Sequence, residues 1–213
     1  MSIARLMLGT ANFGIDDYPP GKGHRRVSRD DAYAIIRHAY SAGIRAFDTA
    51  LAYGNGLAED VLADALDERP AHVTTKLPAG YVADRRPAWL YLQHNPLVHQ
   101  MDPRLDGASV YTAAQVGASI EAGHGHIQVP YWLMDFSLRW VVREERVAVT
   151  TYARQPYGRG QVPCQAALWF ALDSHADYIV VGARTIAQLD DTLCWAESTP
   201  PNPLLPSVCT PGR

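Results

Sequence analysis

Residues 28–50, SRDDAYAIIRHAYSAGIRAFDTA, predict a helix followed directly by a buried strand. Ser28 offers an N-cap with Asp31 three residues on, which is close to a capping box. Apolar residues then recur at helical spacing until Gly43, a natural C-cap. The apolar stretch Ile44–Ala50 that follows predicts a strand. A helix feeding a buried strand is the repeating unit of a parallel α/β sheet.

The same alternation of strands and helices runs along the rest of the chain. The predicted strands are Leu6–Thr10, Ile44–Ala50, His72–Leu77, Trp89–His94, Gln115–Ser119, His126–Tyr131, Val147–Ala153 and Asp177–Gly182. Predicted helices include Glu59–Leu66, Phe136–Glu144, Pro163–Ser174 and Ile186–Glu197. Alternation with this many strands predicts an α/β fold of the (β/α)8 barrel type. A doubly wound open sheet fits the pattern too, but no GxGxxG follows the first strand.

The chain is short for such a barrel, with 213 residues where about 250 is typical. Few residues separate Lys76 from His94, and only IEAGHG follows Ser119 before the next predicted strand. We therefore expect eroded or missing outer helices between strands 3 and 6. Strands without helices would expose an apolar face, which predicts a homodimer through this flank. Residues 1–197 are expected to form one barrel domain, and 198–213 a proline-rich C-terminal tail.

The composition limits the classes of partner. The chain has 19 basic and 22 acidic residues, and this mild acidity argues against nucleic acid or an anionic membrane. No apolar stretch approaches the ~20 residues that span a bilayer, and no signal peptide is evident, so we expect a cytoplasmic protein. The three cysteines lack CxxC spacing, and the pair His124 and His126 lacks a third nearby ligand. No metal is expected.

Four polar residues fall at or just beyond the ends of three consecutive predicted strands: Asp48, Tyr53, Lys76 and His94. Active sites of parallel barrels lie at these carboxyl ends. A tyrosine hydroxyl has a pKa of about 10, which a neighbouring ammonium lowers. Tyr53 could then protonate an oxygen that becomes negative as hydride reaches its carbon, while His94 orients the carbonyl.

Each of these residues also has a structural interpretation. Asp48 could cap a loop, Tyr53 could pack as an aromatic, and a lone His94 is more often structural than catalytic. Lys76 resists such an interpretation best, because an unpaired buried ammonium is costly. The combination is far more specific than any single member.

Several stretches together resemble the aldo-keto reductase superfamily, in the style of its bacterial members. They are LGTANFG, AFDTALAYG, TTKL, YLQHN, IQVPYWLMD, YARQPYGRG and IVVGARTIAQLDDTL. The resemblance implies a (β/α)8 barrel that reduces aldehydes or ketones with NADPH. It also implies that Asp48, Tyr53, Lys76 and His94 are the catalytic tetrad, in agreement with the roles argued above.

The resemblance implies a set of cofactor-binding residues as well. Ser119 and Gln128 match the side chains that hold the nicotinamide carboxamide, and Arg154 matches the loop beside the pyrophosphate. An Asn often follows that serine in the family, and here the residue is Ile120.

At the adenosine end, Gly182, Arg184 and Gln188 match the segment that binds the cofactor. Arg184 suits a 2′-phosphate, because its planar fork binds phosphate oxygens bidentately. Thr192 stands where the family commonly has Asn.

Two other classes of function also fit the sequence. One is a non-redox enzyme, such as a dehydratase, cyclase or isomerase, that uses the same proton-transfer residues. A weaker alternative is a non-catalytic binding or regulatory subunit, which would have no physical need for the four converging polar groups. In the leading interpretation the partner is a small carbonyl substrate.

Overall fold

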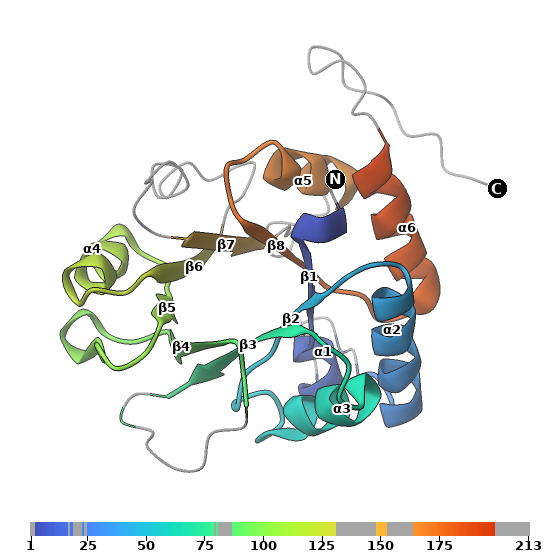
Figure 1. Cartoon of the computed structure of the whole chain (residues 1–213), viewed down its shortest axis with the longest axis horizontal. Coiled ribbons are helices and arrows are strands. Elements are labelled where there is room, and N and C mark those ends of the chain that lie inside the picture. The colour runs from blue at the N-terminus through green and yellow to red at the C-terminus, as the bar shows by residue number, and fades with distance from the viewer. Residues whose placement is uncertain are drawn as a thin grey trace.

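The strands close into a parallel barrel (Figure 1). The computed structural model describes residues 3–16, 18, 23, 25–78, 80, 87–130, 148–152 and 164–198. The strands are β1 Leu6–Gly9, β2 Ala46–Asp48, β3 His72–Leu77, β4 Leu90–His94, β5 Gly107–Ser109, β6 His126–Pro130, β7 Ala148–Tyr152 and β8 Tyr178–Val181. Each pairs in parallel with the next, and β8 pairs with β1. The predicted parallel α/β barrel is confirmed.

The described helices lie outside the ring and cover part of it (Figure 1). They are α1 Ala11–Gly14, α2 Arg29–Ser41, α3 Leu57–Leu66, α4 Ala113–Glu121, α5 Cys164–Leu172 and α6 Ile186–Glu197, with the 3-10 turns η1 Ile3–Arg5 and η2 Val98–Gln100. Ser28 caps α2 by accepting a hydrogen bond from the Asp31 N–H, as its spacing predicts. The apolar face of α2 packs with α3, α5 and α6 against β1, β2 and β8, and forms the main hydrophobic core.

The predicted strand Gln115–Ser119 is wrong, because these residues lie in α4. Thr112 accepts a hydrogen bond from the Gln115 N–H, and the Gln115 side chain accepts one from the Thr112 N–H. This capping box satisfies two free backbone donors and starts a helix. The strand at this place in the barrel is β5, three residues long. A Cβ on Gly107 would lie 1.8 Å from the His126 carbonyl oxygen, so the strand needs glycine there.

The expectation of eroded or missing outer helices between strands 3 and 6 is wrong for the fifth outer helix, the one between β5 and β6, because α4 lies there. Its Val116 packs with Ile127 and Val129 of β6 in a second hydrophobic cluster. Between β4 and β5 the chain forms only the turn η2. The expectations for the third outer helix, for Phe136–Glu144 and for the tail concern stretches that are wholly or largely outside the described residues. The homodimer stays a prediction.

None of the helices in the described parts of the chain has the length and hydrophobicity needed to span a bilayer.

Burial of His126 at the amino end of β6 predicts a loss of stability in mild acid. Burial lowers the pKa of His126 to about 4, and nearby carboxylates, Asp177 first, oppose the shift. An unfolded histidine has a pKa of about 6.5, so below that pH the unfolded chain binds a proton that the folded chain lacks. We expect the free energy of unfolding to fall between about pH 6.5 and pH 4, by at most roughly 3 kcal/mol from this residue.

Urea unfolding across this pH range measures the effect. His126→Gln should make the pH dependence shallower, whereas His99→Gln, at an exposed position, should leave it unchanged. An equal slope in the wild type and His126→Gln would contradict the assignment.

Candidate active site

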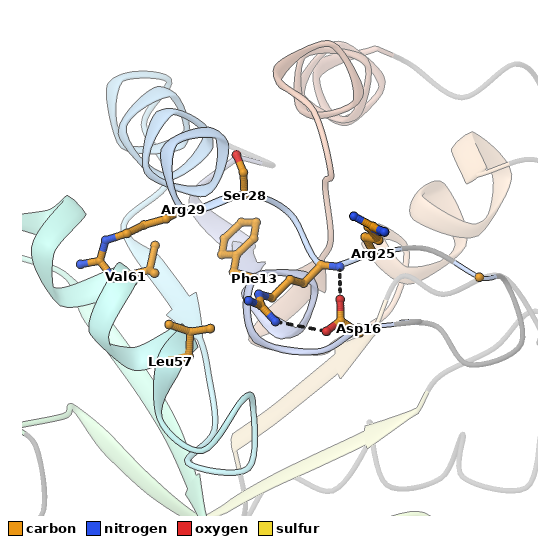
Figure 2. A pocket seen from close by; sticks show the side chains of 9 residues that line it. Phe13, Asp16, Arg25, Ser28, Arg29, Leu57 and Val61 are labelled. Carbon is orange, nitrogen blue, oxygen red and sulfur yellow. Dashed lines mark hydrogen bonds and ion pairs between the residues drawn. The ribbon is translucent and has the colours of Figure 1, made fainter.

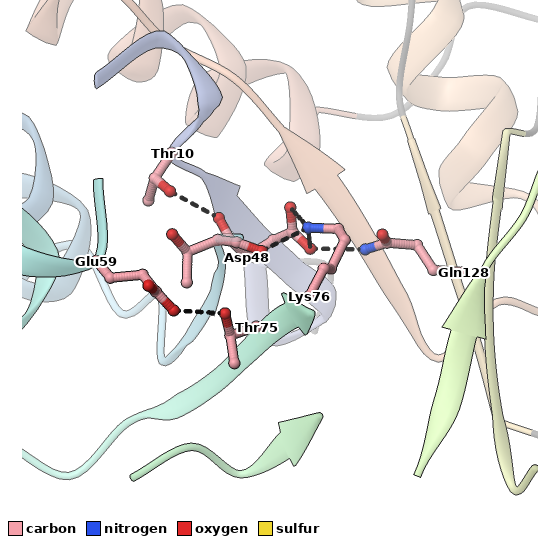
Figure 3. A network of polar contacts seen from close by, with 7 residues as sticks. Thr10, Asp48, Glu59, Thr75, Lys76 and Gln128 are labelled. Atoms are coloured by element: carbon pink, nitrogen blue, oxygen red, sulfur yellow. Dashed lines mark hydrogen bonds and ion pairs between the residues drawn. The ribbon is translucent and has the colours of Figure 1, made fainter. Parts of the chain in front are cut away.

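A buried ion pair lies at the carboxyl ends of β2 and β3. The Lys76 ammonium donates to both Asp48 carboxylate oxygens at 2.8 Å and to the Thr49 carbonyl at 2.6 Å (Figure 3). Lys76 is fully buried and Asp48 is 2% exposed. Three acceptor atoms thus satisfy the three N–H donors of the ammonium. This explains how a lysine can lie inside the barrel, where an unpaired charge would be very costly.

Further polar groups fix the pair in place. The Gln128 side-chain amide in β6 donates to Asp48 Oδ1 at 2.7 Å, and the Thr10 hydroxyl donates to the Asp48 carbonyl at 3.1 Å. Burial lowers the pKa of the Lys76 ammonium below its usual value, and the Asp48 carboxylate opposes that shift. The carboxylate is therefore held rigidly from two sides, and the ammonium is held by the carboxylate.

A second buried acid lies close by and was not expected from the sequence. Glu59 of α3 accepts a hydrogen bond from the Thr75 hydroxyl at 2.6 Å (Figure 3). The negative charge of Glu59 also favours the protonated form of Lys76, and so it opposes the lowering of the Lys76 pKa by burial. Because Glu59 is one of several acids in a predicted helix, no sequence signal sets it apart.

Tyr53 enters the site from the turn after β2. Its ring centroid lies 5.0 Å from the Lys76 ammonium nitrogen. Its position depends on a close backbone contact with α1: a Cβ on Gly14 would lie 2.3 Å from the Tyr53 carbonyl oxygen. Gly54, at φ 68°, lies in the left-handed region, and a Cβ there would lie 2.5 Å from the Gly14 oxygen. Two glycines therefore allow α1 to hold the tyrosine over the ion pair.

His94 completes the group at the end of β4. Its ring lies 6.0 Å from the Tyr53 ring, centroid to centroid, and is nearly perpendicular to it at 85°. Burial, and then the Lys76 charge, lower the pKa of His94 to about 4. The imidazole is therefore neutral at neutral pH and carries one N–H donor. The structure thus brings together all four predicted residues, Asp48, Tyr53, Lys76 and His94.

Ser119 does not lie at the strand ends. It is buried in α4, where its hydroxyl is 2.8 Å from His124 Nδ1. That position does not suit contact with a cofactor in the barrel mouth. The serine at the strand ends is Ser109, which closes β5 between His94 and Gln128 in the barrel register. The sequence signal that could have located Ser109 is the T-x-x-Q capping box at 112–115. This box predicts a helix that begins after residue 112, so the strand has to end before it.

The residues expected at the adenosine end lie together where β8 leads into α6. Gly182 is exposed, and the Arg184 N–H donates to the Gln188 side-chain oxygen at 2.8 Å. The Thr192 hydroxyl turns to its own helix and donates to the Gln188 carbonyl at 2.9 Å. Arg154 lies outside the described residues.

The His124 side chain is committed to structural hydrogen bonds. Its Nδ1 faces Ser119, and its Nε2 lies 2.9 Å from the Asp102 carbonyl. Within the described parts of the chain, no group of three or more His, Cys, Asp or Glu side chains is placed to hold a metal ion.

A buried Asp–Lys pair thus lies beside a tyrosine and a neutral histidine at the carboxyl end of a parallel barrel, and these groups together could transfer a proton. Residues 5–101 match the sequence profile of the Aldo/keto reductase family. The chain is 37% identical over 78 residues to pyridoxal 4-dehydrogenase of Microbacterium luteolum. It is 39% identical over 70 residues to D-threo-aldose 1-dehydrogenase of a Pseudomonas species.

These two matches cover 36% and 33% of this chain, and only 23% and 19% of the relatives. The likeness in fold extends further. An aldo-keto reductase from Klebsiella pneumoniae in complex with NADPH superposes with a TM-score of 0.68 at 17% identity, over 91% of this chain and 86% of that one. Glycerol dehydrogenase from Gluconobacter oxydans superposes at 0.62 and 18% identity, over 95% of both.

The comparisons confirm the resemblance to the aldo-keto reductases. Residues 5–101 match the sequence model of that family, and the barrel as a whole is similar in fold to solved aldo-keto reductases.

Proposed function

We propose that this protein is an oxidoreductase that uses NADPH to reduce an aldehyde or a ketone. The observation that carries the proposal is the fully buried Lys76 ammonium, held by Asp48 and placed 5.0 Å from the Tyr53 ring. The family match over residues 5–101 covers these three residues and His94. The test is whether the protein consumes NADPH and forms the alcohol in equal amounts from members of an aldehyde and ketone panel. Turnover of a carbonyl compound without NADPH consumption would favour the non-redox alternative.

In this proposal Tyr53 is the general acid. When bound, a reduced nicotinamide supplies the hydride that reaches the carbonyl carbon. The Tyr53 hydroxyl gives its proton to the carbonyl oxygen as negative charge develops there. The Lys76 ammonium stabilises the phenolate that remains, and Asp48 keeps the ammonium in place. Tyr53 then regains a proton from solvent. In sum the carbonyl gains one hydride, which carries the two electrons, and one proton, and becomes an alcohol.

His94 has a separate role in the proposal. Because burial keeps the imidazole neutral, its N–H can donate a hydrogen bond to the same carbonyl oxygen without competing as an acid. The two donors, from Tyr53 and His94, fix the carbonyl in one orientation. This positioning adds to the rate because it holds the reacting atoms in line.

The residues present suit a nicotinamide dinucleotide. Asn12 Oδ1 is buried and has no hydrogen-bond partner among the described residues, so a ligand N–H or O–H would satisfy it. Asn12 lies beside Gly182, where an added Cβ would be 3.4 Å from the Asn12 amide nitrogen. Ser109, the last residue of β5, pairs in register with Gln128 of β6, and we place the nicotinamide carboxamide beside these two residues. We propose that Ser109 takes the role that the resemblance implied for Ser119.

Two serine variants test that reassignment. Ser109→Ala should raise the Kd for NADPH by about fivefold, the effect of losing one hydrogen bond of about 1 kcal/mol. Ser119→Ala should leave the Kd unchanged but lower the free energy of unfolding by about 1–3 kcal/mol, because it leaves buried His124 Nδ1 without its partner. Fluorescence titration and urea unfolding measure the two effects. The reverse pattern would restore Ser119 as the cofactor ligand.

The cytoplasmic location stays a prediction from the sequence.

A further inference from the structure

A pocket on the outside of the barrel lies between α3 and the outer face of β3. Its volume is about 480 Å³. Leu62 and Leu66 of α3 and Val73 of β3 form its apolar wall, and Glu59 and Thr49 are among its polar residues. Pockets that bind small molecules are typically about 300–1,000 Å³ in volume and mostly apolar, with a few polar groups. This pocket has that size and composition, and its polar groups indicate the chemistry of the ligand.

Glu59 is a buried acid with one hydrogen-bond donor. It is 7% exposed, and its carboxylate accepts a hydrogen bond from the Thr75 hydroxyl at 2.6 Å (Figure 3). Among the described residues, no Lys, Arg or His nitrogen lies within 4.0 Å of this carboxylate. The amino end of α3 lends a partial positive charge, since Glu59 is in its first turn. Because a carboxylate has about four acceptor sites, Glu59 can still receive further N–H donors.

The acids beside a neighbouring groove have counter-charges, in contrast. This groove, of about 900 Å³, lies between α1, the start of α2 and α3 (Figure 2). Arg26 pairs there with Asp16 at 3.1 Å, and the Arg29 guanidinium pairs with Asp64. These four side chains are more than half exposed, so water also solvates them. The buried carboxylate of Glu59 needs a counter-charge more than they do, because water solvates it less.

The charges at the rim of the α3–β3 pocket do not supply that counter-charge. Arg69 lines the pocket, but its guanidinium donates to the Leu66 carbonyl at 2.9 Å and pairs with Asp67 at 3.6 Å. Glu68, which is exposed, adds a second carboxylate to the lining. The pocket therefore favours a cation over an anion.

Thr49 brings a second unsatisfied group to the same pocket. It is 1% exposed, and its hydroxyl oxygen is buried without a hydrogen-bond partner among the described residues. Buried hydroxyl groups in folded proteins normally have a partner. A ligand in the pocket with several N–H donors can serve both this hydroxyl and the Glu59 carboxylate.

We propose that this pocket binds a small molecule with a primary ammonium group on an apolar body. The ammonium is the counter-charge of Glu59, and its three N–H donors also serve the Thr49 hydroxyl. A primary amine keeps its proton at neutral pH, as the lysine side chain does. The apolar body packs on Leu62, Leu66 and Val73, and the burial of apolar surface there favours binding.

The pocket is distinct from the site in the barrel mouth. Side chains alternate between the two faces of a strand, so Thr75 faces α3 while Lys76 faces the barrel interior (Figure 3). Thr49 lies between the two sites, because its carbonyl accepts a hydrogen bond from the Lys76 ammonium at 2.6 Å. The proposal does not rest on the proposed reductase activity, since it needs only the folded barrel.

Isothermal titration of the full chain with 2-phenylethylamine at neutral pH tests the proposal. The amine should bind at one site per chain. The neutral analogue 2-phenylethanol should bind at least about tenfold more weakly, as expected when a hydrogen bond to a charged group is lost. Glu59→Gln should weaken amine binding by about tenfold and leave binding of the alcohol unchanged. Glu121→Gln, which neutralises an exposed acid at the end of α4, should change neither.

A second variant blocks the pocket without changing Glu59. Ala63 lines the pocket from an exposed position on α3, so Ala63→Trp should fill it and abolish saturable binding of the amine. Ala34→Trp adds the same side chain at an exposed position on α2 and should leave binding unchanged. Urea unfolding midpoints show whether each variant is folded. If Glu59→Gln is not, Ala63→Trp decides the question.

Three results would overturn the proposal. One is no saturable binding of the amine to the wild-type chain. Another is equal affinity for the amine and the alcohol, which would leave the carboxylate without a role. The third is unchanged amine binding in folded Glu59→Gln or Ala63→Trp, which would place the amine elsewhere. Failure of the proposed function looks different, because then NADPH does not bind or carbonyl reduction is absent while these titrations still give an answer.

Discussion

Tyr53→Phe should lower kcat for carbonyl reduction by about 10²–10⁴-fold, the usual contribution of a general acid. The phenyl ring keeps the packing above Lys76 and beside His94, so only the proton donor is lost. The Kd for NADPH should stay within about twofold of the wild-type value, because the hydroxyl acts on the substrate oxygen. Loss of an interaction that is made only in the transition state lowers kcat and leaves binding unchanged. Steady-state NADPH oxidation and a fluorescence titration measure the two quantities.

The matched control is Tyr33→Phe on α2, which removes the hydroxyl of an exposed tyrosine whose ring contacts Arg37 of the same helix. It should leave kcat unchanged. A Tyr53→Phe protein that keeps more than about a tenth of the wild-type rate would contradict the general-acid role.

Lys76→Met should cost both activity and stability. Removing the ammonium leaves the Asp48 carboxylate buried without its counter-charge, and breaking a buried pair in this way costs about 3–5 kcal/mol of unfolding free energy. The tyrosine also loses the charge that stabilises its phenolate, so kcat should fall by at least about 10²-fold. Urea unfolding and steady-state kinetics measure the two losses.

The double variant Asp48→Asn with Lys76→Met separates stability from catalysis. It removes both charges, so much of the lost stability should return, because a buried neutral pair carries no uncompensated charge. Activity should not return, since no group is left to stabilise the phenolate. A Lys76→Met protein as stable as the wild type, or a double variant that regains activity, would contradict the account.

The sequence predicted those parts of the fold and site that depend on local signals. The helix Ile186–Glu197 has the predicted bounds, and Ser28 caps α2 as its spacing to Asp31 indicates. The residues Asp48, Lys76 and His94 meet because parallel strands bring their carboxyl ends to the same face. The helical spacing of apolar residues predicted the helices, and the rule that active sites lie at the carboxyl ends of parallel strands predicted the site residues.

The fifth strand shows where such signals fail. QVGAS has a β-branched valine among small residues, so it was interpreted as a short strand. The capping box at Thr112 and Gln115 instead makes it part of α4. The true strand, Gly107–Ser109, is too short for any alternation to be visible. Ser109 was missed for that reason.

Contacts that helices and loops make with distant segments could not be predicted from the sequence. The Arg184 guanidinium and the Arg25 carbonyl are separated by 159 residues, and Glu59 and Thr75 come from different elements. Their pairing depends on how helices and loops pack around the finished barrel, and no local pattern carries that information.

The central claim is that this barrel binds NADPH and passes its hydride to a carbonyl beside Tyr53. Fluorescence titration of the wild-type protein with NADPH, and in parallel with NADH, tests the claim most directly. Saturable binding of NADPH at one site per chain, tighter than that of NADH, is the predicted result. A folded protein that binds neither nucleotide would contradict the claim and favour non-redox chemistry at the same four residues.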